Sequence, residues 1–166
     1  VDKMYWPSAA VTFEYDNKLM LNSYVDSGYK PVPITEKNKH AIELFLAHIK
    51  NTLSDEKEQT ILLDWLAYVV QNAGKRINWA ILLQGAQGTG KSYFAKVLEW
   101  VLGSNAKSLD PSALGERFTG WAHGAVVNIV EEIRIKGDDK WRIMDRLKPF
   151  ITNSMVQIEE KGRDHR

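Results

Sequence analysis

The stretch that decides the fold is residues 79–92, Trp79-Ala80-Ile81-Leu82-Leu83-Gln84-Gly85-Ala86-Gln87-Gly88-Thr89-Gly90-Lys91-Ser92. Its first half contains Ala80–Leu83, a short apolar run of the kind that forms a strand buried on both faces. Its second half has the glycine spacing of a loop that holds phosphate groups. Apolar residues then recur at helical spacing up to Gly103, which predicts a helix over about residues 91–102. This order of strand, loop and helix favours phosphate binding over a chance match.

Phosphate chemistry explains the glycines. Side chains would crowd a phosphate chain, so the backbone must approach it directly, and glycine permits that approach. Successive backbone N–H groups then form an anion-binding nest at the positive end of a helix. Lys91 is expected to reach the β- and γ-phosphates, and the Ser92 hydroxyl is expected to bind Mg²⁺. The sequence therefore predicts a site for ATP and Mg²⁺ formed by Gly85, Ala86, Gln87, Gly88, Thr89, Gly90, Lys91 and Ser92.

A second apolar run, residues 125–130, predicts another buried strand and ends in Glu131 and Glu132. Ligands bind at the carboxyl ends of strands in parallel sheets, so these acids are expected beside the loop. Glu131 is predicted to hold Mg²⁺, directly or through water, and Glu132 to polarise an attacking water as a general base. The alternative is a pair of solvent-exposed acids with no chemical role. Lys91, Glu131 and Glu132 are the predicted catalytic residues.

The whole chain divides into three predicted parts. Residues 1–33 are predicted to be an extended or linker segment, with short strands near residues 11–15 and 19–21. Residues 34–75 are predicted to be a helical segment. Its helices are expected over about residues 36–53, capped by Thr35, and from Asp55 to about Ala73, with Gly74 as the stop.

Residues 76–166 are predicted to be the phosphate-loop core. A further helix is expected from Asp138 to about Leu147, and Pro149 is expected to end or kink it. Strands that alternate with helices predict an α/β fold, a mostly parallel sheet flanked by helices.

Composition excludes several classes of function. The absence of cysteine excludes disulfides, a cysteine-based zinc site and a thiol nucleophile. No apolar stretch reaches the roughly 20 residues that span a bilayer, so no membrane partner is expected. A net charge of +1 gives no overall attraction to nucleic acid, and any such contact must use local charge. The first residue is Val1, which suggests a piece of a longer protein.

The loop and the acid pair together resemble the core of AAA+ ATPases. Four further stretches narrow the resemblance to the phage and plasmid primase-helicases of helicase superfamily 3. These are Leu63–Tyr68, Arg76–Ser92, Arg117-Phe118-x-x-Trp121 and Leu147–Thr152. The similarity extends over about residues 22–166.

The resemblance implies an ATP-driven homo-hexamer that translocates on single-stranded DNA during replication of a phage or mobile element, in the cytoplasm of the host. It also implies a β-hairpin that contacts DNA in a central channel. Residues 155–160 alternate in part, and Lys161 and Arg163 are the candidates for phosphate contacts at the hairpin tip. A solvated charged tail is the alternative.

The resemblance also shows a departure. The family continues with a strand ending in a polar sensor residue and then an arginine finger, whereas this chain ends at Arg166. We therefore expect a C-terminally truncated core that binds nucleotide and hydrolyses it weakly or not at all alone. Arg134, Arg146 and Lys148 are the basic residues that could act across a subunit interface instead.

Two other classes of function stay open. The first is a phosphate-loop kinase acting on a small molecule, which the acid pair and the preceding helical segment disfavour. The second is a nucleotide-gated assembly module without motor activity, which the missing sensor and finger would suit.

Overall fold

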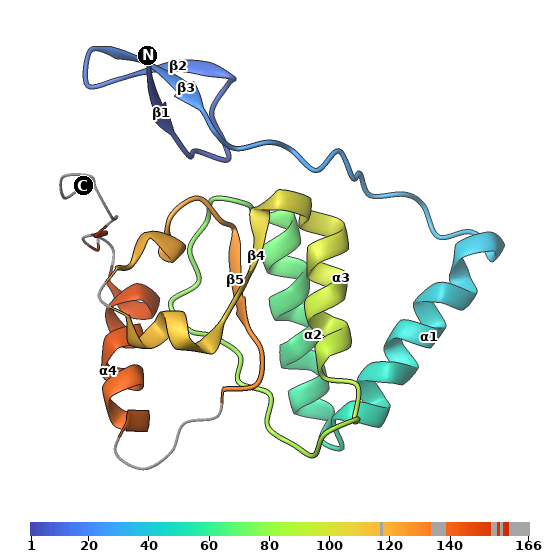
Figure 1. The fold of residues 1–166 in the computed structure, drawn as a ribbon. Helices are drawn as coiled ribbons and strands as arrows, with labels where there is room; N and C mark the ends of the chain where they lie inside the picture. The colour runs from blue at the N-terminus through green and yellow to red at the C-terminus, as the bar shows by residue number, and fades with distance from the viewer. Residues whose placement is uncertain (117, 134–138, 154–155, 157, 160–166) are drawn as a thin grey trace.

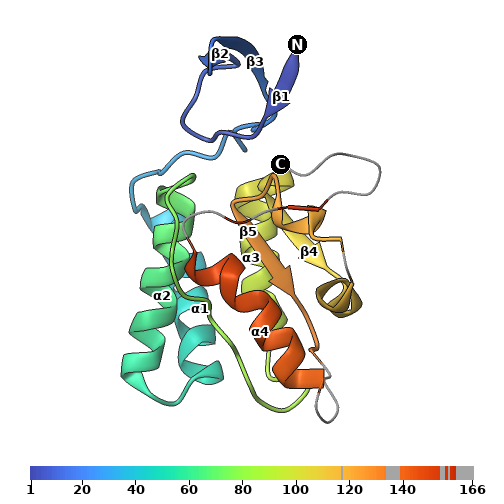
Figure 2. The same cartoon turned by 90° about the vertical axis from the view of Figure 1, so that its left-hand side faces the viewer.

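The computed structural model describes the chain except for residues 117, 134–138, 154–155, 157 and 160–166. Figure 1 shows a small N-terminal sheet above a body of helices and two further strands. In the body, α3 packs against β4 on one side of the strand pair, and α4 lies on the other side (Figures 1 and 2). The mixed α/β class predicted from the sequence is confirmed.

The N-terminal sheet has the strand order β1-β3-β2, from β1 (Asp2–Met4), β2 (Thr12–Tyr15) and β3 (Lys18–Asn22). β2 and β3 confirm the two predicted short strands and pair as an antiparallel hairpin, while β1, which was not predicted, pairs parallel to β3. Asp16 and Asn17 form the turn with φ of 51° and 57°. Two successive positive φ values are typical of the type I′ turns that join two strands through two residues.

The two predicted helices of the middle segment are confirmed as α1 (Glu36–Thr52) and α2 (Glu56–Gln71). The Asp55 carboxylate accepts hydrogen bonds from the N–H groups of Lys57 and Glu58 at 2.8 and 3.0 Å, as expected for its cap position. α2 ends at Gln71, slightly before the predicted end, and Gly74 lies in the turn beyond with φ of 89°.

The core of the body lies between α2, α3 (Ser92–Leu102) and β5 (Val127–Val130). Leu98 and Leu102 repeat at helical spacing on α3, which buries one face of that helix. The buried cluster consists of Ile49, Leu62, Leu66, Val69, Phe94, Leu98, Leu102 and Val127.

The body contains one parallel strand pair among the described residues, β4 (Ala106–Leu109) beside β5, with Ala106 opposite Val127. The predicted strand at residues 125–130 is confirmed, while β4 was not predicted. Short 3-10 helices, η1 (Gly103–Asn105), η2 (Pro111–Gly115) and η3 (Gly120–Ala122), connect these elements.

The predicted strand at Ala80–Leu83 is wrong. The segment carries no ladder of backbone hydrogen bonds in the described part of the chain, where β4 and β5 pair with each other. Ile81 and Leu83 pack on the core, but Leu82 is 74% exposed. An apolar run forms a strand only where a neighbouring strand supplies hydrogen bonds. The larger parallel sheet expected around this run is therefore not seen among the described residues.

α4 (Asp139–Thr152) continues past the predicted end and contains Pro149. The prediction that Pro149 ends the helix is wrong: Pro149 lacks the N–H group that would bond to the Asp145 carbonyl, yet α4 continues to Thr152. The Asn153 N–H group still donates to the Pro149 carbonyl at 3.0 Å. No helix of the described chain is both long and apolar enough to cross a membrane.

Candidate nucleotide site

The predicted phosphate loop lies between the extended segment and α3, which begins at Ser92. Gly88 and Gly90 have φ of 82° and 85°, a conformation that other residues adopt only under strain. A Cβ atom at Gly88 would meet nothing within 4 Å, so this glycine is required for its backbone angle alone. Gly88 and Gly90 thus have the unusual backbone angles expected of loop glycines, whereas Gly85 does not have a positive φ.

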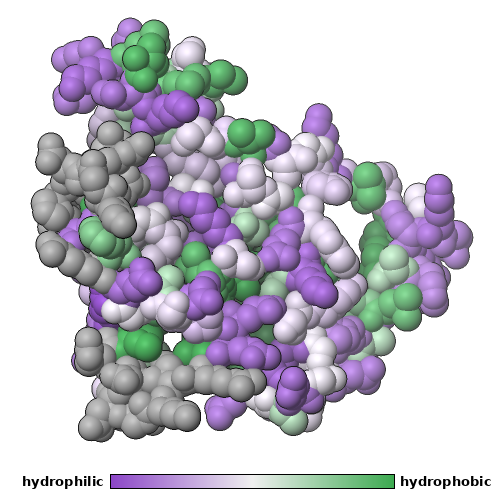
Figure 3. All heavy atoms as spheres, in the orientation of Figure 1, coloured by the Kyte–Doolittle hydropathy of each residue, from purple (hydrophilic) through white to green (hydrophobic). Residues whose placement is uncertain are grey.

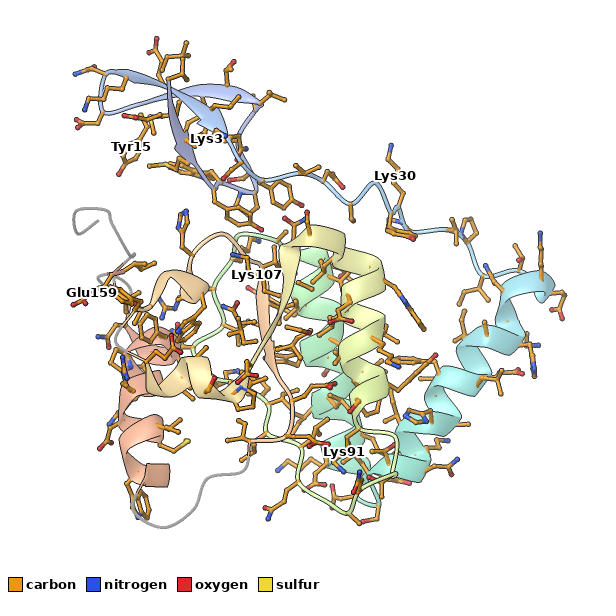
Figure 4. All side chains as sticks on the ribbon, viewed as in Figure 1. Lys3, Tyr15, Lys30, Lys91, Lys107 and Glu159 are labelled. Atoms are coloured by element: carbon orange, nitrogen blue, oxygen red, sulfur yellow. The ribbon has the colours of Figure 1, made fainter. Side chains whose placement is uncertain are left out.

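The Lys91 side chain folds into its own loop. Its Nζ atom donates to the carbonyls of Gly85 and Ala86 at 3.0 and 2.5 Å and contacts the Thr89 hydroxyl at 2.9 Å. The Thr89 hydroxyl donates in turn to the Ala86 carbonyl at 3.0 Å. The ammonium group therefore connects the start of the loop with Thr89 near its end, and Figure 4 shows Lys91 in this loop.

The last two turns of α1 contact the loop from outside. The His48 Nε2 atom lies 3.0 Å from the Gly90 carbonyl oxygen, and the Thr52 hydroxyl lies 3.4 Å from the Thr89 carbonyl. The His48 ring also packs edge-on against Tyr93 in the first turn of α3, with centroids 4.8 Å apart. Sequence reasoning missed both contacts, because nothing in a lone histidine or threonine marks a partner so distant along the chain.

The predicted acid pair follows β5 directly. Glu131 and Glu132 are exposed, and β5 ends at the same end of the molecule as the phosphate loop (Figures 1 and 2). Glu132 has φ of 51°, an uncommon value for a residue with a long side chain. Such backbone strain concentrates at functional sites, where the surrounding structure maintains it.

Two of the flanking motifs meet in space. The rings of Trp121 and Phe150 lie 5.0 Å apart, and the Arg146 guanidinium donates to the carbonyls of Gly115 and Glu116. Arg146 therefore binds its own chain, which argues against its predicted role across a subunit interface. Lys148 is exposed, and Arg134 lies outside the described residues.

The predicted DNA-contacting residues Lys161 and Arg163 also lie outside the described residues, as does part of the predicted hairpin. Glu159, which is described, exchanges two hydrogen bonds with Thr119. The Thr119 N–H group donates to the Glu159 carbonyl, and the Glu159 N–H group donates to the Thr119 hydroxyl, each at 2.9 Å. Glu159, near the C-terminus, therefore lies beside Thr119 in the segment that precedes β5.

The chemistry of the donors is compatible with Mg²⁺. Among the described residues, no three His, Cys, Asp or Glu side chains gather in a group that could hold a metal by themselves. A Mg²⁺ ion bound with ATP needs no such group, because phosphates and water supply most of its ligands. The Ser92 hydroxyl and the Glu131 carboxylate are hard oxygen donors of the kind that this ion prefers.

Solved structures of the C-terminal region of NrS-1 resemble this fold. The apo structure of residues 305–718 has a TM-score of 0.80 at 20% identity, and covers 98% of this chain and 39% of that one. A second, an A form apo structure of the same region, has a TM-score of 0.77 at 20% identity, over 98% of this chain and 38% of that one. At this identity the likeness concerns the fold alone, and this chain spans less than half of the matched structures.

No curated protein matches the chain. A family model does match, over residues 83–166, which is just over half of the 166 residues. The match begins near the end of the extended segment, and so includes the phosphate loop, both acids and α4. The chain therefore belongs to the family described as "Family of unknown function (DUF5906)".

Proposed function

We propose that this chain is the ATP-binding and ATP-hydrolysing core of a DNA helicase or primase-helicase that serves the replication of a phage or mobile element. The observation that carries the proposal is the conformation of the phosphate loop. Gly88 and Gly90 take positive φ directly before α3, and Lys91 lies inside the loop they form. A loop of this shape at a helix N-terminus suits an anion. The AAA+ type of parallel sheet is part of the same proposal.

The contacts of Lys91 suggest how the loop would receive ATP. Lys91 now binds neutral carbonyl oxygens of Gly85 and Ala86. Hydrogen bonds between an ammonium and a phosphate are charge-assisted and roughly twice as strong as neutral ones. A triphosphate would therefore draw Lys91 away from these carbonyls and onto its β- and γ-phosphates, while the loop N–H groups bind the same chain of phosphates.

Hydrolysis requires the acids at the end of β5. In the proposal, Ser92 and Glu131 hold Mg²⁺, which when bound would neutralise charge on the phosphate oxygens. Glu132 orients a water molecule and accepts its proton. The positive φ of Glu132 suits a residue whose conformation serves one task.

Single-stranded DNA as partner, a homo-hexamer, and DNA contacts by Lys161 and Arg163 belong to the proposal as well. A basic residue from a neighbouring subunit would complete the site. Because Arg146 is engaged with Gly115 and Glu116, that residue is better sought elsewhere, and Lys148 is the exposed candidate.

Nucleotide binding is tested by titrating a fluorescent ATP analogue with Mg²⁺ into the 166-residue chain. The unmodified chain should bind it, and Lys91→Ala should abolish binding, because the ammonium that pairs with the phosphates is lost. Lys96→Ala is the matched control, since Lys96 is exposed on the same helix and should leave affinity unchanged. Equal binding by Lys91→Ala and the unmodified chain would sink the proposal.

Turnover is tested in the full-length protein with and without single-stranded DNA. Glu132→Gln should retain ATP binding and lose phosphate release, because the amide cannot accept the proton from water. A protein that binds ATP but releases no phosphate before substitution would instead be an assembly module. Transfer of phosphate to a metabolite without release of free phosphate would indicate a kinase.

A further inference from the structure

The contact between α1 and the phosphate loop has a feature that the proposed function leaves unused. Gly90 has φ of 85°, and a Cβ atom built on it would lie 2.3 Å from His48 Cε1 and 2.9 Å from His48 Nε2. The imidazole therefore occupies the space beside this glycine. Gly90 is required both by its backbone angle and by the close approach of His48.

The imidazole packs against two aromatic rings of α3. The ring of Tyr93 lies 4.8 Å away edge-on, and the ring of Phe94 lies 5.2 Å away in a tilted arrangement. Phe94 is buried, with 3% of its surface exposed. The half-buried His48 ring thus packs from α1 against the first turn of α3.

The direction of the hydrogen bond follows from the acceptor. The Gly90 carbonyl oxygen can only accept, so His48 Nε2 carries the hydrogen and donates at 3.0 Å. The same carbonyl accepts from the Tyr93 N–H group at 3.0 Å. Two donors, one from each helix, therefore fix the orientation of the Gly90 carbonyl.

The orientation of this carbonyl determines the direction of the next N–H group. The peptide bond is planar and trans, so the Gly90 C=O and the Lys91 N–H point in opposite directions. Holding the carbonyl toward His48 and α3 aims the Lys91 N–H away from them. This N–H belongs to the row of backbone donors expected to bind phosphate.

We propose that His48 is a positioning residue of the nucleotide site: by holding the Gly90 carbonyl, it keeps the Lys91 N–H group oriented toward the phosphates. The inference rests on the proposed function, since it assigns His48 to the same site. In this inference, the C-terminal end of α1 supports the phosphate loop through His48. The Thr52 hydroxyl donates to the His48 carbonyl at 2.9 Å and lies 3.4 Å from the Thr89 carbonyl, so His48 makes the main contact with the loop.

The test measures affinity for a fluorescent ATP analogue with Mg²⁺ in variants that separate the ring from the donor. His48→Phe keeps a ring between Tyr93 and Phe94 but cannot donate, and its affinity should fall roughly three- to tenfold. His48→Gln retains an N–H donor at similar reach and should bind within about twofold of the unmodified chain. His40→Ala is the control, because His40 is exposed on α1 and should leave affinity unchanged.

Thermal unfolding of each variant separates positioning from stability. A positioning role predicts that affinity follows the donor, with His48→Gln binding more tightly than His48→Phe whatever their melting temperatures. Equal affinity of His48→Phe and the unmodified chain would overturn the inference, as would equal losses in the Phe and Gln variants. If His48→Phe does not fold, His48→Met replaces it, since methionine matches glutamine in length and lacks the donor.

The same titration keeps this inference apart from the proposed function. If Lys91→Ala binds as well as the unmodified chain, the nucleotide site itself is wrong. If Lys91→Ala loses binding while His48→Phe does not, the site stands and only the role of His48 fails.

Discussion

At the scale of single residues, Gly88 and Gly90 distinguish two reasons for a glycine. Both have positive φ, at 82° and 85°, so a side chain at either position strains the backbone. Only Gly90 also faces a neighbour, because a Cβ atom there would meet His48 at 2.3 Å. The difference between the two positions therefore reports on the contact between α1 and the loop.

Gly88→Ala is expected to destabilise the chain by about 1–2 kcal/mol, the cost of a left-handed conformation for alanine. Gly90→Ala should cost at least about 1 kcal/mol more, because the ring of His48 packs against two aromatic rings of α3 and would have to move aside. Urea unfolding of the two variants measures the difference. The control measures Gly90→Ala in a His48→Ala background, where its cost relative to His48→Ala alone should equal the cost of Gly88→Ala. Equal costs for the two single variants would contradict the close contact.

At the scale of elements, the helices could be predicted from the sequence, because their apolar stripes and caps are local patterns. The apolar stripes of α1, α2 and α3 and the cap at Asp55 gave helices close to those observed, since a helix satisfies its own backbone. Strands depend on distant partners. β4 contains Lys107 and Ser108 and shows no apolar run, yet it forms because β5 lies beside it. Ala80–Leu83 is fully apolar and forms no strand, because no partner lies beside it among the described residues.

The candidate site likewise has features that local sequence predicts and others that depend on distant partners. The loop glycines, Lys91 and the acids are readable from spacing, because phosphate chemistry needs these residue types in this order. The contact of His48 with Gly90 is not readable, since it joins residues 42 positions apart and depends on how α1 packs. The proline in α4 was misjudged for a similar reason, because the Arg76 guanidinium binds the last carbonyls of that helix from the linker after α2.

Arg76 is expected to cap α4. Its Nη2 atom donates to the Phe150 carbonyl at 2.7 Å and lies 3.4 Å from that of Pro149. Arg76→Ala should destabilise the end of α4 by about 1 kcal/mol, a value at the low end for a charged donor because Arg76 is exposed. Amide hydrogen exchange at residues 150–153 would increase, while that of α2 would not. Lys75→Ala, one residue earlier, is the control, and an equal effect there would argue against the cap.

At the scale of the whole molecule, one buried side chain connects the N-terminal sheet to the body. Asn105 is 2% exposed, and its Oδ1 atom accepts from the Tyr5 hydroxyl at 2.9 Å. Its Nδ2 atom donates to the carbonyls of Val25 and Leu102 at 2.7 and 3.1 Å. The side chain thus joins the segment around the sheet to the end of α3. Several hydrophobic side chains of α1 and of the N-terminal sheet stay at the surface (Figure 3).

This connection makes the docking of the sheet sensitive to high pH. Burial, and to a smaller degree the neighbouring Tyr24, raise the pKa of Tyr5 from 10.0 to about 12. The folded chain therefore holds the phenol proton more tightly than the unfolded chain. The stability that this provides is complete below pH 10 and is lost as the pH rises toward about 12. The loss of the proton also removes the donor to Asn105, so the sheet should detach in the same range.

Tyr5→Phe isolates this effect from the titration of lysines, which both proteins share. The stability difference between the unmodified chain and Tyr5→Phe should be constant up to about pH 10 and should shrink above it, because only the unmodified chain has a phenol to ionise. Urea unfolding at a series of pH values measures the difference. Cleavage by a protease in residues 26–34, which join the sheet to α1, should rise over the same range in the unmodified chain and start high in Tyr5→Phe. A difference that stays constant through pH 12 would mean that Tyr5 does not hold the sheet to the body.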